Sequence, residues 1–313
     1  MSTPPSPGPS AASRAASPAA SSAAQRVDGT DAPRVRVVCV VYHPGDELLR
    51  FVRTLAAASA HPVELVVVDN GTEHDVARAA TAEAGGRLVV AGSNLGYGAA
   101  ANRGAQGART PWLVIANSDV EWTPGSLDRL VAAGDEQPSA GSLGPMLLNT
   151  DGTTYPSARA LPSLRQGAGH ALFGRVWPGN PWTRAYHARQ ESTGGYLREA
   201  GWLSGACLLL RRTAFEQVGG FDESYFMFFE DVDLGERLGR AGWENLYVPD
   251  VQVTHVGGTS WRERPAPMIR AHHASARTYL ERRYPRWYQA PVRLALRIGL
   301  ATRERVQLRT PSR

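Results

Sequence analysis

The stretch from Trp112 to Trp122 constrains the fold most, because it places a carboxylate directly after an unbroken apolar run. Residues 112–116, WLVIA, carry no charge, and the polar triplet Asn117-Ser118-Asp119 follows them. A run of this length that ends in polar residues is typical of a strand buried on both faces of a parallel sheet. Open α/β sheets bind ligands at the carboxyl ends of such strands. We therefore expect Asp119 at the mouth of a binding site, where it can hold a divalent cation against a phosphate.

The segments before this stretch repeat an alternation of strand and helix. Polar residues follow each apolar run; the runs are 35–41, 64–68 and 87–90, and the helical patterns between them are 46–55 and 75–84. Strand–helix–strand units of this kind build a parallel sheet. We predict an α/β domain with a mostly parallel sheet flanked by helices. Asp69 and Asn70 then end the second strand at the same edge as Asp119.

Small and amide-bearing residues, from Asn94 to Gly104, open the next helix. Small side chains there let the backbone approach a ligand closely. The spacing of Gly96, Gly98 and Gly104 does not match the dinucleotide-binding glycine fingerprint, which also belongs after the first strand. A dinucleotide-binding site is therefore not predicted.

Two blocks in the second half of the chain carry further polar chemistry. An apolar strand within 201–212 is entered through Ser204 and Gly205. In the segment 226–238, acidic residues crowd the apolar start of a helix: Glu230, Asp231 and Asp233. A later strand, 248–253, leads into a loop that begins at His255.

The sequence between these halves is less regular. A helix at 125–133 and an apolar stretch at 142–148 continue the sheet. Residues 149–200 are rich in Gly, Pro and aromatic residues and have weak periodicity, so we expect a loop-rich segment that carries substrate specificity.

The two ends of the chain differ from its middle. Residues 1–25 include 20 Ala, Ser and Pro, and they lack aromatic or branched aliphatic side chains, so we expect a disordered leader over residues 1–33. The catalytic-sized domain covers 34–260. Residues 261–313 contain 13 Arg and three Glu, a net charge of +10, and form a basic helical tail in this prediction. The net charge of the whole chain is only +5.

Cysteine and hydropathy indicate the compartment. Cys39 and Cys207 each lie in an apolar run, where a single thiol is usually a small buried hydrophobe, and two such residues form no disulfide framework. No apolar run reaches 18 residues, and the N-terminus lacks a signal-peptide pattern. We expect a cytoplasmic protein that neither spans a membrane nor is secreted by that route.

Four pieces of sequence, in this order, resemble the inverting glycosyltransferases of family 2, which have the nucleotide-diphospho-sugar transferase (GT-A) fold. They are Val66-Val67-Val68-Asp69-Asn70, Asn94-Leu95-Gly96-Tyr97-Gly98 with Asn102, Asn117-Ser118-Asp119, and Phe229-Glu230-Asp231-Val232-Asp233-Leu234 followed by His255. The resemblance covers about Val35 to Ser260. Within the family, the chain looks similar to the actinobacterial rhamnosyltransferases that extend a polyprenyl-diphosphate N-acetylglucosamine during cell-wall synthesis.

The resemblance implies roles for individual residues. It makes Asp231 the catalytic base, with Glu230 beside it, and makes Asp119 and His255 ligands of Mg²⁺ or Mn²⁺. Residues expected to contact the nucleotide sugar are Asp69, Asn70, Asn94, Gly96, Asn102, Asn117, Ser204 and Gly205. A metal ion suits this chemistry because the leaving diphosphate must be neutralised, and a carboxylate in apolar surroundings suits it because the acceptor hydroxyl must lose a proton. The implied partners are dTDP-rhamnose and a lipid-linked saccharide.

The sequence departs from the family pattern in two places. Asn117 stands where many relatives have an acidic residue, which leaves one carboxylate in the metal motif and makes His255 more important. Tyr42-His43-Pro44 replaces the usual residues after the first strand, which puts the base contact there in doubt. Ordinary structural roles compete as well: a lone aspartate is often a turn residue, and Trp202, Ser204 and Gly205 could be core residues instead of pocket lining.

Other functions remain open from the sequence. The donor could be a UDP-sugar, as in a galactofuranosyltransferase, or the chain could be a non-catalytic sugar-nucleotide-binding module, although the acidic pair argues against the latter. A sugar nucleotidyltransferase is disfavoured because Tyr42 to Asp46 lacks a triphosphate-binding loop. In the tail, apolar residues from Val292 to Leu300 alternate with arginines, which is consistent with a peripheral contact at the inner face of the plasma membrane or with a solvated helix. Nucleic acid is not expected as a partner, because no aromatic platform accompanies the arginines, and a homo-oligomer is left open.

Overall fold

The computed structural model describes residues 32–162, 197–257 and 265–309. Nearly all of the predicted leader and the middle of the predicted specificity segment lie outside these residues. The ends of that segment are described, and they form short strands: β7 (Thr154–Tyr155), β8 (Ala158–Arg159) and β9 (Arg198–Ala200).

The N-terminal half is the predicted parallel sheet with a helix after each of its first three strands. Its strand order is β3-β2-β1-β4. The elements are β1 (Val35–Val41), α1 (Asp46–Ala58), β2 (Val63–Asp69), α2 (Asp75–Glu83), β3 (Arg87–Val90), α3 (Tyr97–Ala105) and β4 (Trp112–Asn117). In the register, Val41 of β1 is level with Asp69, and Val40 is level with Asn117. The polar residues that follow these strands therefore meet at one edge.

Beyond β4 the sheet is mixed, in the order β4-β11-β6-β12-β5. The antiparallel strand β11 separates β4 from β6, and β12 runs parallel to β6. The carboxyl end of β12 thus returns to the edge where β4 ends. The elements here are β5 (Val120–Trp122), α4 (Ser126–Asp135), β6 (Ala140–Leu148), β10 (Trp202–Leu203), β11 (Cys207–Arg211), α7 (Arg212–Gln217), α8 (Glu230–Arg240) and β12 (Glu244–His255).

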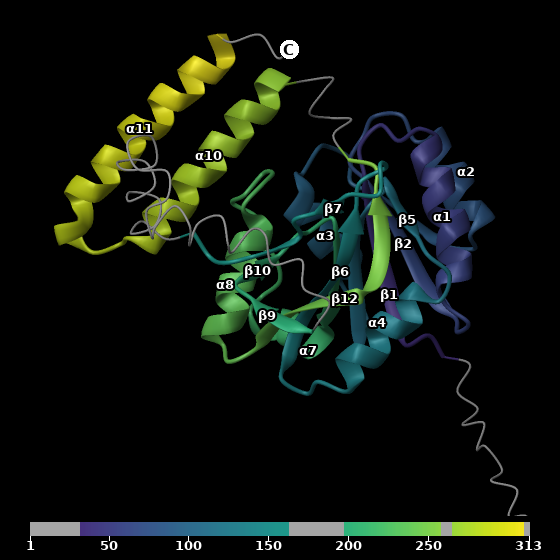
Figure 1. Ribbon diagram of the computed structural model, residues 1–313. Coiled ribbons are helices and arrows are strands. Elements are labelled where there is room, and N and C mark those ends of the chain that lie inside the picture. The colour runs from purple at the N-terminus through teal and green to yellow at the C-terminus, as the bar shows by residue number, and fades with distance from the viewer. Residues whose placement is uncertain (1–31, 163–196, 258–264, 310–313) are drawn as a thin grey trace, which may run out of the picture. The chain divides into compact units, whose positions relative to one another are not determined.

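Helices cover both faces of the sheet (Figure 1). Alternate residues of β1 point to opposite sides: Val37 and Cys39 pack with α1, α2 and α4, whereas Val38 and Val40 pack with α3, α7 and α8. Because both faces are buried, the strand sequences read as continuous apolar runs instead of alternating ones. This explains why the strands could be recognised from the sequence.

The glycines of the 94–104 stretch serve packing within the protein. A Cβ added at Gly104 would lie 2.3 Å from Cγ1 of Val38, so this glycine lets α3 lie directly on the sheet. Gly96 has φ +86°, and a Cβ there would lie 2.1 Å from the carbonyl oxygen of Phe226. We expected the backbone here to lie close to a ligand. At Gly96 and Gly104 it lies close to other residues of the protein instead.

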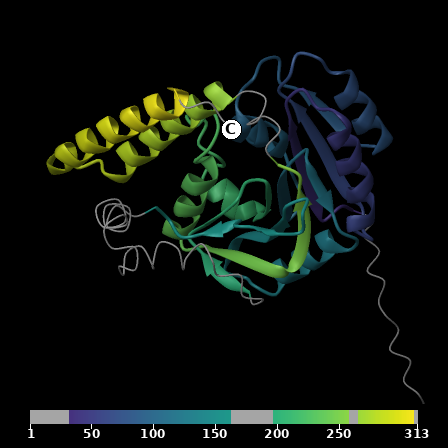
Figure 2. The same cartoon turned by 45° about the horizontal axis from the view of Figure 1, so that its top comes forward.

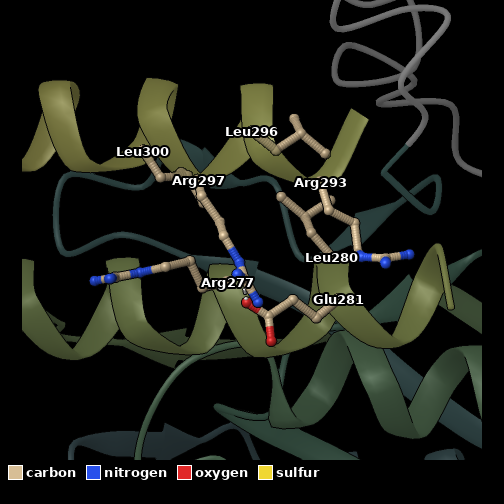
Figure 3. A pocket seen from close by; sticks show the side chains of 7 residues that line it. All are labelled: Arg277, Leu280, Glu281, Arg293, Leu296, Arg297 and Leu300. Atoms are coloured by element: carbon tan, nitrogen blue, oxygen red, sulfur yellow. Dashed lines mark hydrogen bonds and ion pairs between the residues drawn. The ribbon is translucent and has the colours of Figure 1, made fainter. Parts of the chain in front are cut away.

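The C-terminal residues form two helices, α10 (Pro265–Arg283) and α11 (Ala290–Arg309), joined through the short helix η1 (Trp287–Gln289). The two helices lie side by side (Figure 1; Figure 2). Leu280 of α10 and Leu296 and Leu300 of α11 line a small pocket between the two helices, and Arg297 reaches across to Glu281, 2.8 Å away (Figure 3). Among the described helices, none combines the length and hydropathy needed to cross a bilayer.

The tail helix α10 is tied to the segment that precedes α8. Ser275 donates a hydrogen bond to the carbonyl oxygen of Met227 (2.7 Å), and the Tyr279 hydroxyl donates one to Glu236 of α8 (2.7 Å). The Tyr279 ring also lies 5.6 Å from that of Phe229. The basic tail therefore begins as a packed part of the fold.

Candidate active site

The predicted catalytic and metal-binding residues gather at one edge of the sheet, where β4 and β12 end and β5 and β11 begin. Asp119 occupies the turn between β4 and β5, and His255 is the last residue of β12, level with Val120. Gly205 lies just before β11, whose first residue is level with Ala116 of β4. The start of α8 brings Glu230 and Asp231 to the same edge, because the Gly205 amide donates a hydrogen bond to Asp231.

Asp119 and His255 form one corner of the site. The backbone oxygen of Asp119 accepts the amide of Val256 (3.0 Å), and its Oδ2 accepts the amide of Gly257 (3.0 Å), so the turn holds the end of β12. Oδ1 of Asp119 lies 3.2 Å from Nε2 of His255. The amide nitrogen of Asn117 is 3.3 Å from the same ring nitrogen. Two ligand atoms, one oxygen and one nitrogen, thus converge here.

The charge of Asp119 is favoured by its neighbours. Burial raises the pKa of this carboxyl, but the hydrogen bond and charge of His255 together with the Gly257 amide outweigh burial and hold the pKa below its ordinary value. Asp119 is therefore an anion at neutral pH.

The geometry of this corner fits a divalent cation. Oδ1 of Asp119 is buried, and the polar atom that the described residues bring to it is Nε2 of His255. Its 3.2 Å separation from Nε2 of His255 is close to the roughly 3 Å expected between neighbouring ligands of one octahedral cation. No set of three or more ligating side chains occurs among the described residues, which offer two potential ligands at this corner.

Glu230 and Asp231 form the second corner, at the first turn of α8. Asp231 accepts two backbone amides: that of Gly205 at Oδ2 (3.0 Å) and that of Val232 at Oδ1 (2.8 Å). On the other side of the same glycine, the Tyr97 hydroxyl donates to the Gly205 carbonyl oxygen (2.6 Å). Gly205 thus hydrogen-bonds both to Tyr97 of α3 and to Asp231 of the acidic pair.

The fold raises the pKa of both carboxyls of the acidic pair, but Asp231 receives hydrogen bonds from other residues that favour its charged form. Burial, followed by the charge of Asp231, raises the pKa of Glu230 to about 8. Burial also raises the pKa of Asp231, but the amides of Gly205 and Val232 act against this rise. Hydrogen bonds to the charged form favour it, and the buried Oε2 of Glu230 has no such donor among the described residues. The proton therefore belongs on Glu230 and the negative charge on Asp231.

The turn that presents this pair is held in an unfavourable backbone conformation. Phe228 and Phe229 have φ values of 67° and 66°, in the left-handed region that bulky residues rarely adopt. Such a conformation persists only where surrounding structure imposes it, and it occurs often at functional sites. Here α10 supplies contacts: His272 lies 5.5 Å from Phe228 and 5.4 Å from Phe229, ring to ring.

Two residues predicted to contact the nucleotide have side chains engaged within the protein. Asp69 is fully buried, and its carboxylate accepts the amide of Gly71 (2.8 Å) and contacts Nδ1 of His74 (2.7 Å). The side chain of Asn70 donates to the carbonyl oxygen of Gly96 (3.0 Å). Both therefore shape the loops between β2 and α3.

The remaining predicted contacts divide by position. Asn94 is exposed, and its side-chain oxygen accepts the Gly96 amide (3.0 Å). Asn102 is occupied on both ends by the backbone of Phe221, at 2.8 and 2.9 Å, so it anchors the turn before the acidic segment. Gly205 lies beside Asp231, whereas Ser204 donates its backbone amide to the carbonyl oxygen of Ser157 (2.8 Å).

Three residues near the site had no predicted role. Tyr97 lies inside the Asn94–Gly98 motif, but its partner Gly205 is 108 residues away, so the sequence carries no sign of their bond. Tyr155 lies 5.8 Å from His255, ring to ring, and Arg159 lies over Tyr155 and Trp202. Both come from the segment whose weak periodicity predicted only a loop.

Comparison with known proteins agrees with this arrangement. The profile described as "Glycosyltransferase like family 2" matches residues 33–289. The chain is 47% identical over 289 residues to the N-acetylglucosaminyl-diphospho-decaprenol L-rhamnosyltransferase of Mycobacterium tuberculosis, covering 88% of this chain and 94% of that protein.

Solved structures share the fold. The mannosyltransferase PcManGT of Pyrobaculum calidifontis, in complex with GDP-Man and Mn²⁺, aligns with a TM-score of 0.51 and 19% identity over 78% of this chain and 64% of its own. GalNAc-T7 with UDP, GalNAc and Mn²⁺ aligns with a TM-score of 0.53 and 16% identity over 71% of this chain, which spans only 44% of that protein. The GT-A fold expected from the sequence is confirmed. By its matching profile and its mycobacterial relative, the chain belongs to glycosyltransferase family 2.

Proposed function

We propose that this glycosyltransferase moves L-rhamnose, with inversion, from dTDP-rhamnose to a hydroxyl of a polyprenyl-diphosphate-linked N-acetylglucosamine in cell-wall synthesis. The observation that carries the proposal is the 47% identity to the mycobacterial rhamnosyltransferase over 94% of that protein's length. The acidic pair supports an enzyme over a non-catalytic binding module, because two adjacent carboxyls buried at one pocket have no evident use in binding alone.

Asp231 is the proposed catalytic base. Its carboxylate takes the proton of the acceptor hydroxyl as that oxygen bonds to the anomeric carbon of rhamnose. The bond from that carbon to the β-phosphate oxygen breaks in the same displacement, and dTDP leaves with the bonding electrons. The raised pKa of Asp231 lies nearer to neutral pH than that of an ordinary aspartate, and a base with such a pKa accepts a proton more readily.

Asp119 and His255 would hold the metal ion, Mg²⁺ or Mn²⁺. When bound, the ion neutralises charge on the departing diphosphate. Asn117, whose side-chain amide nitrogen is 3.3 Å from Nε2 of His255, remains a proposed contact of the nucleotide sugar beside the metal. Asp69, Asn70, Asn94, Gly96, Asn102, Ser204 and Gly205 remain proposed elements of the nucleotide-sugar pocket; the contacts of Asp69, Asn70 and Asn102 assign them to shaping its loops.

We also propose that the tail contacts the inner face of the plasma membrane, where a lipid-linked acceptor is found. The exposed apolar residues support this, together with the basic charge around them. They are concentrated on η1 and α11: Trp287, Tyr288, Val292, Leu294, Ile298 and Val306. Aromatic and apolar side chains interspersed with arginines suit the boundary of an anionic bilayer.

Calorimetric titration tests the donor and the metal together. Wild-type protein is titrated with dTDP-rhamnose, UDP-glucose and UDP-galactose, with Mg²⁺, with Mn²⁺ and with chelator. We expect preference for the dTDP sugar, dependent on metal, and loss of that dependence in Asp119→Ala. Tighter binding of a UDP sugar would contradict the proposed donor, and equal binding with chelator would contradict the role of Asp119.

Turnover tests the reaction itself. Wild-type protein, dTDP-rhamnose and a short-chain prenyl-diphosphate N-acetylglucosamine should give a disaccharide whose new linkage is inverted, as read by NMR. Binding of the donor without any product would move the assignment to the non-catalytic module.

A further inference from the structure

Arg159, the last residue of β8, is a cation beside the active site whose charge is left available. Its guanidinium carbon lies 5.4 Å from the ring centre of Trp202 and 5.8 Å from that of Tyr155. Its Nε donates to the carbonyl oxygen of Pro156 (2.8 Å). One hydrogen bond and two aromatic rings thus fix the plane of the guanidinium, while its terminal nitrogens form no ion pair with any described acidic residue.

Arginines with a structural role look different in this protein. Arg36 is 6% exposed, and its terminal nitrogens bond to Glu64 and to the carbonyl oxygens of residues 104–107. Arg211 reaches the carbonyl oxygens of Gly134, Gln137 and Ala140. In both, hydrogen bonds to backbone carbonyl oxygens occupy donors of the guanidinium, and Arg36 also has the Glu64 carboxylate as a partner. Arg159 is only half-buried, and its terminal nitrogens make no ion pair with a described acidic residue.

The two aromatic rings beside Arg159 belong to residues near the two parts of the active site, the Asp119–His255 pair and the Glu230–Asp231 pair. Tyr155 packs edge-to-face on His255, 5.8 Å between ring centres, and so lies next to the proposed metal corner. Trp202 belongs to β10, three residues before Gly205, whose amide binds Asp231. Arg159 is therefore linked to the proposed metal ligand through the Tyr155 ring and to the segment that binds the proposed base through Trp202.

The electrostatics agree with this position. Burial raises the pKa of Asp231, and the positive charge of Arg159 is among the influences that lower it. The two side chains nevertheless form no ion pair within the described residues. A cation that affects the base, yet is paired with no acidic residue in the described part of the chain, is suited to an anion of the substrate.

We propose that Arg159 binds a diphosphate group of the substrate. This inference rests on the proposed function, in which donor and acceptor each carry a diphosphate. A planar guanidinium matches two phosphate oxygens at once, and its stacking on Trp202 and Tyr155 reduces the entropy lost on binding. The acceptor diphosphate is one sugar away from the hydroxyl that meets Asp231; the donor diphosphate lies at the metal corner.

The test measures binding of each diphosphate by Arg159→Gln, which removes the charge, and by Arg159→Lys, which keeps it without the planar fork. Arg198→Gln is the matched control, since Arg198 also stacks on an aromatic ring, Tyr247 at 4.7 Å, near the other end of β12. Calorimetry with dTDP and Mg²⁺ reads the donor side. The KM for prenyl-diphosphate N-acetylglucosamine, compared with that for an alkyl N-acetylglucosaminide without phosphate, reads the acceptor side.

For Arg159→Gln we expect about a 10- to 100-fold loss in one of these two readouts, with partial recovery in Arg159→Lys and none of the loss in Arg198→Gln. A KM increase confined to the diphosphate acceptor identifies the acceptor, and weaker dTDP binding identifies the donor. Unchanged dTDP binding together with equal effects on both acceptors would overturn the inference. If wild-type protein itself neither binds dTDP nor turns over the acceptor, the proposed function fails first, and the two failures are thereby distinguished.

Discussion

Among single residues, Glu230 and Asp231 have the most direct chemical consequence, because two adjacent carboxyls should behave in opposite ways. Asp231→Asn removes the proposed base, so turnover should fall by about 10²- to 10⁴-fold with donor binding retained. Glu230→Gln imitates the protonated acid that its raised pKa favours, so most of the turnover at pH 7 should remain. Initial rates with a short-chain acceptor check both, and a larger loss in Glu230→Gln than in Asp231→Asn would contradict the assignment.

The pKa of Glu230 also predicts how stability depends on pH. Its ordinary value is 4.5 and its value in the fold is about 8, so between these pH values the folded chain keeps a proton that the unfolded chain releases. The free energy of unfolding therefore falls as pH rises through this window. Glu230→Gln has no such proton to lose, and we expect it to be more stable than wild type at pH 8 by on the order of 1–3 kcal/mol.

Urea denaturation at pH 4 and pH 8 checks this. The advantage of Glu230→Gln should be present at pH 8 and absent at pH 4, below both pKa values. An advantage equal at both pH values would mean that packing, not ionisation, causes it.

The family resemblance predicted Asp231 as the base, but the residue pattern alone did not separate it from Glu230. Both lie at the start of one helix, where the helix dipole favours either charge. What separates them is the Gly205 amide, which only the folded chain brings to Asp231. Asp119 and His255 were assigned through the family resemblance, and their close approach depends on the pairing of β12 with β5.

At the scale of elements, the N-terminal strands and helices were predictable because each strand is buried on both faces and each ends in polar residues. The sequence analysis interpreted the glycine-rich start of α3 as a ligand contact. A glycine in the sequence shows that another group can come close to the backbone, but it does not show whether that group belongs to a ligand or to the protein. Gly104 in fact lies against Val38 and Val68 of the sheet.

Gly104→Ala should therefore overpack the interface between α3 and the sheet. The added Cβ would lie 2.3 Å from Cγ1 of Val38, and we expect a loss of about 1–3 kcal/mol in the free energy of unfolding. The matched control is Gly239→Ala, a helical glycine of α8 with nothing within 4 Å, which should gain roughly 0.5–1 kcal/mol from lower chain entropy. Urea denaturation compares the two, and a stable Gly104→Ala would contradict the close packing.

The helix α10 should act on catalysis through the turn at Phe228 and Phe229. Tyr279→Ala removes the ring beside Phe229 and the hydrogen bond to Glu236, so the acidic pair loses support and kcat should fall by about 10-fold or more. Tyr279→Phe keeps the ring and should lose less. Donor affinity should change little, because Asp119 and His255 are held by other contacts.

This prediction is measured with a water-soluble acceptor and no lipid, which separates it from membrane binding. Thr278→Ala is the control, because that hydroxyl bonds only within α10, to Ala274. Equal kcat in Tyr279→Ala and wild type, below the melting temperature of both, would restrict α10 to a role in stability.

At the scale of the whole chain, the family and the α/β core could be recognised from motif order and strand patterns, whereas Tyr155 and Arg159 could not, and Trp202 was left open between pocket lining and core. Tyr155, Arg159 and Trp202 come from short strands of two or three residues. Segments so short have no measurable periodicity. Their positions are set by strand pairing: β8 pairs with β10, β7 with β6, and the neighbouring short strand β9 with β12. The residues on these short strands beside the active site are therefore the ones that the sequence predicts least well.

The tail was predicted from charge, and its exposed residues now allow a specific test of membrane contact. Trp287 is 84% exposed and Ile298 59%, so replacing both by serine removes apolar surface without disturbing the core. We expect the double variant to bind vesicles that contain anionic lipid about 10-fold more weakly, or weaker still. Without these two apolar side chains, η1 and α11 insert less well into the bilayer, and their arginines then lie farther from the anionic headgroups. Binding by wild type should weaken with added salt and with purely zwitterionic vesicles.

Co-sedimentation with vesicles measures this affinity, and Val76→Ser, a 40% exposed residue of α2, is the control that should bind like wild type. A second copy of the chain is the competing way to cover Trp287 and Ile298. Sedimentation equilibrium without lipid decides between them: a wild-type dimer that becomes a monomer in the double variant, with vesicle binding unchanged, would assign this face to self-association and overturn the membrane contact. A wild-type monomer whose vesicle binding depends on Trp287 and Ile298 would place the packed helix α10 between a lipid-bound surface and the turn that carries Asp231, so that membrane contact and catalysis share one element.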